Sequence, residues 1–458
     1  CSPWPCGEVS APAGVAAYLS WAAPAALPAH GVGNRSDLPL PFEALLIGAA
    51  LALLASFVGL AFLWREPRLR PEDGWEVPRG VQAVLDARWF RGLLAGLSLL
   101  LTCWVLLALV LGRDDANNPV PYVVYVWLWV GMPFLSLVFG AIWAILNPVR
   151  WLHRGIAALA RIPRDFTLTD VDLGFWPAAA GLFAFTWLEL VAPDRTTMLV
   201  LRLAIGLFVL VSIVGSLSFG ERWFREGDPF EVLSRLYGQL SPLGRRPDGR
   251  LVLRTPVHGP SLLAARRGLL ATAAVMLGGT AYDSLTADIR YAGSVQSTAA
   301  PDLVRTATLL GVILLVGGAL HLAAAVSAWL SGVPVRGMAA DLAPSLLPIA
   351  AGYLVAHYYS LLVFQGPRTL ALLSDPLGVG ANWLGTGGVA PWGWPIQPTL
   401  VAAVQAGAIV LGHVLGVVVA HERAIRVLPR RAAVVGQVPL MVLMIGYTVG
   451  GLSLLFSG

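Results

Sequence analysis

The chain has 458 residues, of which 57% are hydrophobic and 12% are charged. A soluble protein carries about twice that share of charged residues, so the composition excludes an ordinary soluble enzyme. All 31 basic residues are arginine, and the formal net charge is only +5. This small excess is interrupted by long apolar runs, which argues against nucleic acid as a partner and for the lipid bilayer.

Ten apolar runs are long enough to cross the roughly 30 Å hydrocarbon core of a membrane as helices. They cover residues 42–64, 90–111, 121–146, 173–191, 197–219, 268–285, 303–330, 338–363, 399–420 and 433–456. We therefore predict an all-α, polytopic transmembrane helix bundle over residues 42–458. An extracytoplasmic segment over residues 1–41 precedes it.

The arginines are distributed unevenly between the two sides of this bundle. The loops that follow the odd-numbered spans hold 24 arginines, and the segments on the opposite side hold five. Arginine-rich loops are retained on the cytoplasmic side of a membrane. We therefore predict that the N-terminus and the C-terminus both lie outside.

The cytoplasmic loop over residues 220–267 contains the sequence Asp228-Pro229-Phe230-Glu231. An aspartate cap, a proline at the first helical position and a glutamate three residues after the cap are typical of a helix start. Apolar residues then recur at helical spacing. The loop is therefore predicted to be interfacial, with a helix lying on the inner membrane surface.

The outer loop over residues 366–398 is rich in glycine and proline. It also contains three tryptophans, Trp383, Trp392 and Trp394. Tryptophan favours the interface between membrane and water, so we predict an interfacial or re-entrant cap here.

The N-terminal segment has two unusual features. Cys1 is followed by serine, as in a bacterial lipoprotein after processing, which predicts lipidation at Cys1 and firm anchoring. A disulfide between Cys1 and Cys6 and an arbitrary start of the sequence are the alternatives. Residues 13–29 are small and apolar but too short for a span, and they resemble a retained signal peptide.

Several stretches resemble a family of polytopic bacterial membrane proteins catalogued as fenitrothion hydrolase. They are residues 29–41 (AHGVGNRSDLPLP), 220–249 (GERWFREGDPFEVLSRLYGQLSPLGRRPDG), 356–366 (AHYYSLLVFQG) and 412–423 (GHVLGVVVAHER). The family name implies hydrolysis of an organophosphate triester, although the resemblance includes no motif that assigns catalytic residues. Together with the topology, it implies a location in the bacterial cytoplasmic (inner) membrane.

Ionisable residues at bilayer depth are costly and mark functional sites. A helix rises 1.5 Å per residue, which places His321 roughly 22 Å and His413 roughly 20 Å below the outer face. Two histidines at one depth on different helices suit axial ligation of haem b. Hydrogen bonding between the helices is one alternative. A metal site completed by Asp341, near the same inner third of the membrane, is another.

A second group of residues lies at the outer ends of its segments, namely His30, His357, Glu189 and Asp283. Two histidines and two carboxylates suit a divalent metal ion that activates water for phosphotriester hydrolysis. The sequence lacks the motifs of zincins, ATPases, serine hydrolases and dinucleotide-binding enzymes. These negative findings leave the chemistry of the outer group open.

Three functions are compatible with these patterns. The first is a membrane subunit that passes electrons through haem or quinone, with other membrane or extracytoplasmic subunits as partners. The second is a metal-dependent phosphotriester hydrolase at the outer face, and the third is a transporter. Internal repeats would favour a transporter, but the first five spans show no convincing similarity to the last five.

Overall fold

The computed structural model describes residues 37–163, 166–390, 397–430 and 432–456. Within these residues the chain is helical apart from loops and one small sheet, which confirms the all-α prediction. Cys1 and Cys6, and with them the predicted lipidation, lie outside the described residues.

Eight helical segments of the described residues are long and apolar enough to cross a membrane. Five of them are single helices, namely α2 (Phe42–Leu63), α4 (Arg88–Leu111), α10 (Met198–Phe219), α15 (Pro301–Ser331) and α18 (Pro398–Val427). Two are interrupted helices, the first made of α5 (Pro119–Tyr122), the π-helix η2 (Val123–Gly131) and α6 (Met132–Phe139), and the second of α16 (Met338–Leu342), the 3-10 helix η4 (Ala343–Ser345) and α17 (Leu346–Leu373). The last consists of α19 (Ala433–Gly436) and α20 (Val438–Leu455). Many of their leucine and valine side chains are exposed on the outside of the bundle, as contact with lipid requires. The chain is a multi-pass membrane protein.

The other two predicted spans form α9 (Trp176–Leu190) and α13 (Leu269–Thr286), with 15 and 18 residues. α13 packs against α15, α9 and α17 and is buried along most of its length. Its alanine, glycine and threonine residues make α13 less apolar than the eight segments above. Such a composition is possible because α13 is enclosed by other helices and does not have to face lipid. Among the described residues, helices therefore occupy all ten predicted positions.

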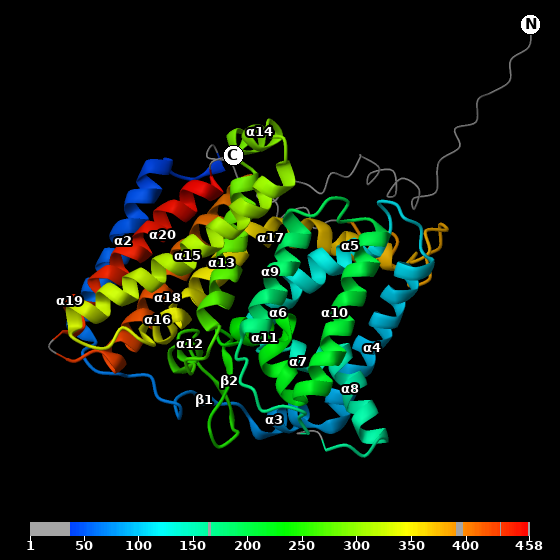
Figure 1. The fold of residues 1–458 in the computed structure, drawn as a ribbon, viewed down its shortest axis with the longest axis horizontal. Helices are drawn as coiled ribbons and strands as arrows, with labels where there is room; N and C mark the ends of the chain where they lie inside the picture. The colour runs from blue at the N-terminus through cyan, green and yellow to red at the C-terminus, as the bar shows by residue number, and fades with distance from the viewer. Residues whose placement is uncertain (1–36, 164–165, 391–396, 431, 457–458) are drawn as a thin grey trace, which may run out of the picture.

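The two ends of the bundle can be told apart by the chain termini. The rings of Phe42 and Phe456 lie 6.1 Å apart, so α2 begins where α20 ends (Figure 1). An even number of spans requires this arrangement. We call this end the outer end, following the predicted topology. The opposite, inner end holds α3 (Arg79–Asp86), α8 (Pro148–Leu159) and α12 (His258–Leu262) (Figure 1).

A small antiparallel sheet also lies at the inner end, with the strand order β1-β3-β2 (Figure 1). Its strands are β1 (Trp75–Glu76), β2 (Leu243–Arg245) and β3 (Leu251–Leu253). Trp75 of β1 and Leu243 of β2 both pair with Leu253 of β3. The sheet therefore joins the loop that follows α2 to the long loop that follows α10.

The predicted helix after Asp228 forms, but it does not lie on the membrane surface. The π-helix η3 (Trp223–Gly227) leads into α11 (Pro229–Gly238), whose residues are all buried except Arg235. α11 packs against α6, α9 and the short helix α7 (Trp143–Leu146). This position is possible because the polar residues of α11 find partners inside the bundle. α8 carries exposed Leu152, Ile156 and Leu159 and has the surface character predicted for α11.

The outer loop begins later than predicted, because α17 continues through Pro367 to Leu373. The added turns pack against α5 and η2, where Leu372 joins the buried residues Tyr122 and Val126. This burial compensates for the backbone hydrogen bond that proline cannot make. Trp383 packs edge to face on Trp104 at 5.7 Å. Trp392 and Trp394 lie outside the described residues. A further short helix at the outer end, α14 (Ile289–Gln296), follows α13.

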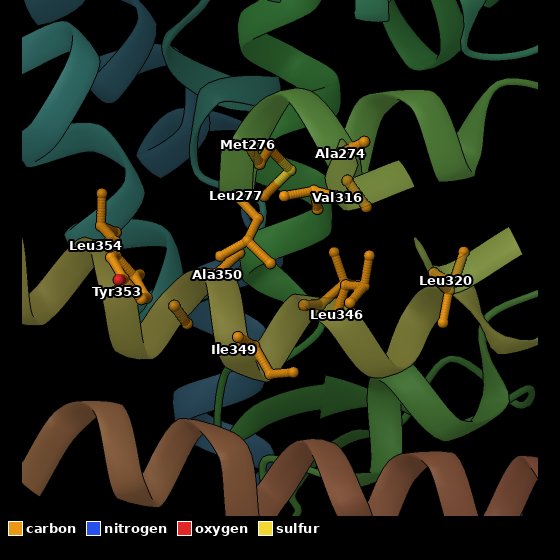
Figure 2. Packing of buried hydrophobic residues seen from close by; sticks show 14 of the residues in the cluster. Ala274, Met276, Leu277, Val316, Leu320, Leu346, Ile349, Ala350, Tyr353 and Leu354 are labelled. Carbon is orange, nitrogen blue, oxygen red and sulfur yellow. The ribbon is translucent and has the colours of Figure 1, made fainter. Parts of the chain in front are cut away.

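The centre of the bundle is formed by α13, α15, α17 and α18. Figure 2 shows Leu346 and Ala350 of α17 beside Leu277 of α13 and Val316 of α15. α17 and α18 approach so closely that a Cβ atom on Gly352 would collide with the carbonyl oxygen of Ala408. Small residues permit such close helix packing in membranes, and here the packing fixes α17, which carries His357.

Candidate functional site

A buried polar cluster joins α13 and α17 in the outer half of the bundle. Nε2 of His357 lies 2.8 Å from Oδ2 of Asp283, and the hydroxyl of Tyr358 donates to the same oxygen at 3.0 Å. Oγ of Ser284 lies 3.2 Å from Nδ1 of His357. The side chains of His357 and Asp283 are only 1% and 3% exposed. We call Asp283, Ser284, His357 and Tyr358 the outer cluster.

Glu189 of α9 is buried beside the outer cluster, close enough for its carboxyl group to interact electrostatically with that of Asp283. Its Oε2 atom has no hydrogen-bond partner among the described residues. A buried carboxyl oxygen without a partner costs free energy, and such groups concentrate where a proton or a ligand is bound. Three ionisable groups, Glu189, Asp283 and His357, therefore lie in one part of the bundle.

This arrangement agrees only in part with the predicted divalent metal site. His357 and Asp283 are in contact, and Glu189 is near, but His30 lies outside the described residues. Within the described part of the chain, no group of three or more histidine, cysteine, aspartate or glutamate residues is arranged to hold a metal ion. In this arrangement the two ring nitrogens of His357 face Ser284 and Asp283, so the structure shows a hydrogen-bonded pair here and His30 remains the untested member of the predicted site.

The structure does not bring the two predicted haem ligands together. His413 is buried, its Nδ1 lies 2.9 Å from the carbonyl oxygen of Ile409, and its Nε2 has no partner among the described residues. His321 lies on the exposed side of α15. α15 packs mainly against α13 and α20, whereas α18 packs mainly against α17 and α2. The two imidazoles thus face different surroundings. Asp341, the third residue of the alternative metal site, lies at the inner end, 3.9 Å from Arg423.

A second buried cluster, which the sequence analysis did not identify, lies near the inner end. Nη1 of Arg150 is 2.7 Å from Glu231, and Nη2 of Arg150 is 2.5 Å from Glu221. The amide of Asn147 donates to Oδ2 of Asp228 at 3.1 Å, and the other oxygen of Asp228 accepts the backbone N–H of Glu231 at 2.8 Å. We call Asn147, Arg150, Glu221, Asp228 and Glu231 the inner cluster. All of these side chains are buried or nearly so.

A repeated pattern in the sequence could have revealed the inner cluster. Residues 136–140 (SLVFG) and 216–220 (SLSFG) end two transmembrane helices, and a tryptophan follows each glycine by three positions. Both glycines have positive φ, at 84° and 57°, as a sharp helix end requires. Next come Asn147-Pro148 in one copy and Asp228-Pro229 in the other.

The two copies of this pattern meet face to face in the fold. Asn147 and Asp228 cap α8 and α11, and they hydrogen-bond to each other. The residues three positions further on, Arg150 and Glu231, form an ion pair. The short repeat therefore creates a symmetric contact between equivalent positions. In one pair the carboxyl group faces a neutral amide, and in the other it faces a guanidinium group.

The two carboxyl groups of the inner cluster with shifted pKa values differ in their partners. Burial raises the pKa of Asp228 to about 7, and the Glu231 carboxylate also raises it, while hydrogen bonds from Glu231 N–H and Asn147 oppose the shift. Burial also acts to raise the pKa of Glu221, but Arg154 and Arg150 outweigh it and lower that pKa to about 2. Asp228 therefore changes charge near neutral pH, and Glu221 stays ionised.

This difference predicts a pH-dependent stability. An aspartate has a pKa near 3.8 in an unfolded chain, whereas the pKa of Asp228 in the folded protein is about 7. The raised pKa stabilises the folded protein fully below pH 3.8, and this stabilisation is lost as the pH rises through about 7. We expect unfolding of the wild type in detergent to become easier by about 2–3 kcal/mol between pH 5 and 7, relative to Asp228→Asn. Asparagine still caps the helix but does not titrate. Parallel pH profiles of the two proteins would contradict this prediction.

A third buried group, at the inner end of α18, has a structural role. The carboxylate of Glu422 accepts hydrogen bonds from Nε1 of Trp64 at 2.8 Å and from the backbone N–H groups of Arg68 and Leu69 at 3.2 and 3.1 Å. It also pairs with Arg426 at 2.6 Å. Glu422 therefore fixes the loop after α2 to the end of α18.

Comparisons of the chain with protein-family models, curated proteins and solved structures found no match.

Proposed function

We propose that this chain is a proton-translocating protein of the bacterial inner membrane. The observation that carries the proposal is the hydrogen-bonded pair of Asp283 and His357, enclosed between α13 and α17. An ionisable pair inside a membrane protein is expensive, and such pairs are typical of proton relays. Histidine exchanges protons near neutral pH, and the neighbouring carboxylate provides the second site for the same proton.

The positions of the two clusters support this proposal. The outer cluster lies near the ends of α9 and α13, and the inner cluster lies near the opposite end of the bundle. Asp228 of the inner cluster has a pKa of about 7, which suits a group that both accepts and releases a proton. Protonatable groups are thus available near each side of the membrane.

The test is proton flux into liposomes that contain the purified protein and a pH-sensitive dye, driven by an imposed membrane potential. We expect Asp283→Asn and His357→Gln each to reduce the protein-dependent flux at least tenfold, because an amide side chain cannot take up and release a proton. His321→Gln is the matched control, since His321 lies on the exposed side of α15. Flux no greater than in empty liposomes, or equal flux in all variants, would refute the proposal.

Phosphotriester hydrolysis, which the family resemblance implies, is the second candidate function. Ser284, His357 and Asp283 form a hydrogen-bonded series with serine and aspartate on opposite ring nitrogens. Serine hydrolases use the same three residue types, although there the serine faces Nε2 and the aspartate faces Nδ1. Ser284→Ala separates the two functions. Proton translocation requires Asp283 and His357 but not the Ser284 hydroxyl, whereas hydrolysis by a serine nucleophile is abolished by this change.

A further inference from the structure

An open groove of about 580 Å³ lies where α2 ends at the inner end of the bundle. Its lining residues are Phe62, Leu63, Arg65, Glu66, Pro67, Arg68, Arg70 and Asp73. The groove is separate from the outer and inner clusters, and neither cluster contributes a residue to it. Its position at the end of a transmembrane helix puts it at the level where lipid headgroups lie.

The groove has an excess of positive charge. Arg65, Arg68 and Arg70 form no ion pair with any carboxylate in the described part of the chain. The two acidic residues that line the groove are already engaged. Glu66 pairs with Arg430 at 2.8 Å, and Asp73 accepts the backbone N–H of Arg70 at 2.8 Å. The positive charges of these three arginines are therefore not neutralised by an ion pair among the described residues and can attract an anion.

The backbone that carries these arginines is held in place. Glu422 accepts the N–H groups of Arg68 and Leu69, and the Leu69 side chain is buried. The Arg68 guanidinium stacks over the Trp64 ring at 5.2 Å and donates to the carbonyl oxygen of Leu63 at 2.5 Å. A fixed backbone reduces the entropy that is lost when an anion binds.

The groove adjoins an apolar surface that faces the lipid. Phe62 and Leu63 line the groove and are 67% and 75% exposed. Leu51, Leu54 and Val58 continue this exposed surface along α2 toward the outer end. A ligand that satisfies both surfaces has an anionic head and a long apolar tail.

We propose that the groove binds an anionic phospholipid of the inner leaflet, with its phosphate among Arg65, Arg68 and Arg70 and its acyl chains along α2. Arginine is well suited to phosphate because its guanidinium group donates two parallel hydrogen bonds. Because Glu422 holds the groove, a bound lipid would tie α2 to α18 through the same loop.

The test is titration of the detergent-solubilised protein with short-chain phosphatidylglycerol or phosphatidylcholine, read as the shift in unfolding temperature. We expect phosphatidylglycerol to stabilise the wild type and phosphatidylcholine not to do so. The triple variant Arg65→Gln, Arg68→Gln, Arg70→Gln should bind phosphatidylglycerol at least tenfold more weakly, since each arginine beside an anionic headgroup adds to the binding affinity.

The matched control removes three exposed arginines at the inner end that also lack ion pairs among the described residues, namely Arg79→Gln, Arg88→Gln and Arg225→Gln. It changes the net charge equally and should keep wild-type affinity. Equal loss in both triple variants would show a general charge effect and overturn the proposal. Inorganic phosphate is the second arm. If it stabilises the wild type as well as the lipid does, the groove binds a soluble anion and the lipid assignment is wrong.

Discussion

Glu422→Ala should prevent the protein from accumulating in a folded form. The substitution leaves Trp64 Nε1 and the backbone N–H groups of Arg68 and Leu69 without their acceptor. Each buried donor that loses its partner costs about 1–3 kcal/mol. Arg426 also loses its carboxylate partner. The expected destabilisation exceeds about 4 kcal/mol, a large part of the stability of a typical protein. The measurement is the yield of monodisperse protein and its unfolding temperature in detergent.

Two variants show whether this effect arises from the hydrogen bonds of Glu422. Glu66→Ala removes a carboxylate that is 67% exposed and that pairs with Arg430, so it should cost less than about 1 kcal/mol. Glu422→Gln keeps one acceptor oxygen and should lie between the wild type and the alanine variant. If Glu422→Ala is no worse than Glu66→Ala, Glu422 does not hold the loop.

The helical segments were predictable because membrane helices are marked by length and apolar composition along the chain itself. The start of α11 was predictable for a similar reason, since Asp228 and Pro229 act on the turn that directly follows them. The burial of α11 was not. It depends on Ser136, whose hydroxyl is 2.8 Å from that of Ser234, and on Arg150, which neutralises Glu231. These partners are about 80 to 100 positions away, and local patterns carry no information about them.

Depth arithmetic explains why some of the candidate residues lie in contact and others do not. It placed Asp283 and His357 near the outer ends of their helices, and the structure brings them into contact. It also placed His321 and His413 at one level, yet His321 is exposed and His413 is buried. The rise per residue fixes height, but the direction in which a side chain points depends on how the helix is rotated against its neighbours. In helices that are apolar on every side, the sequence gives little indication of that rotation.

Rotation and spacing are fixed instead by contacts such as the one between α17 and α18. Gly352→Leu should destabilise the protein by about 3 kcal/mol or more, because a side chain there meets the backbone of α18 and forces the two helices apart. A Cβ atom on Gly352 would collide with the Ala408 carbonyl oxygen and lie 3.1 Å from Cα of Gly412. His357 lies five residues further along α17, so the displacement should also lengthen its contact with Asp283 and reduce proton flux.

Gly407→Leu on α18 is the matched control for this last prediction. A Cβ atom on Gly407 meets nothing within 4 Å, and the residue is exposed on the outside of the bundle. Leucine is a better helix former than glycine, so this variant should be as stable as the wild type or more stable. The measurement is the unfolding temperature of both variants in detergent, together with their proton flux in liposomes. Shifts of the same sign and size in both variants would show that α17 and α18 do not depend on this close contact. A stable Gly352→Leu protein with full flux would show that the spacing of these helices does not position His357.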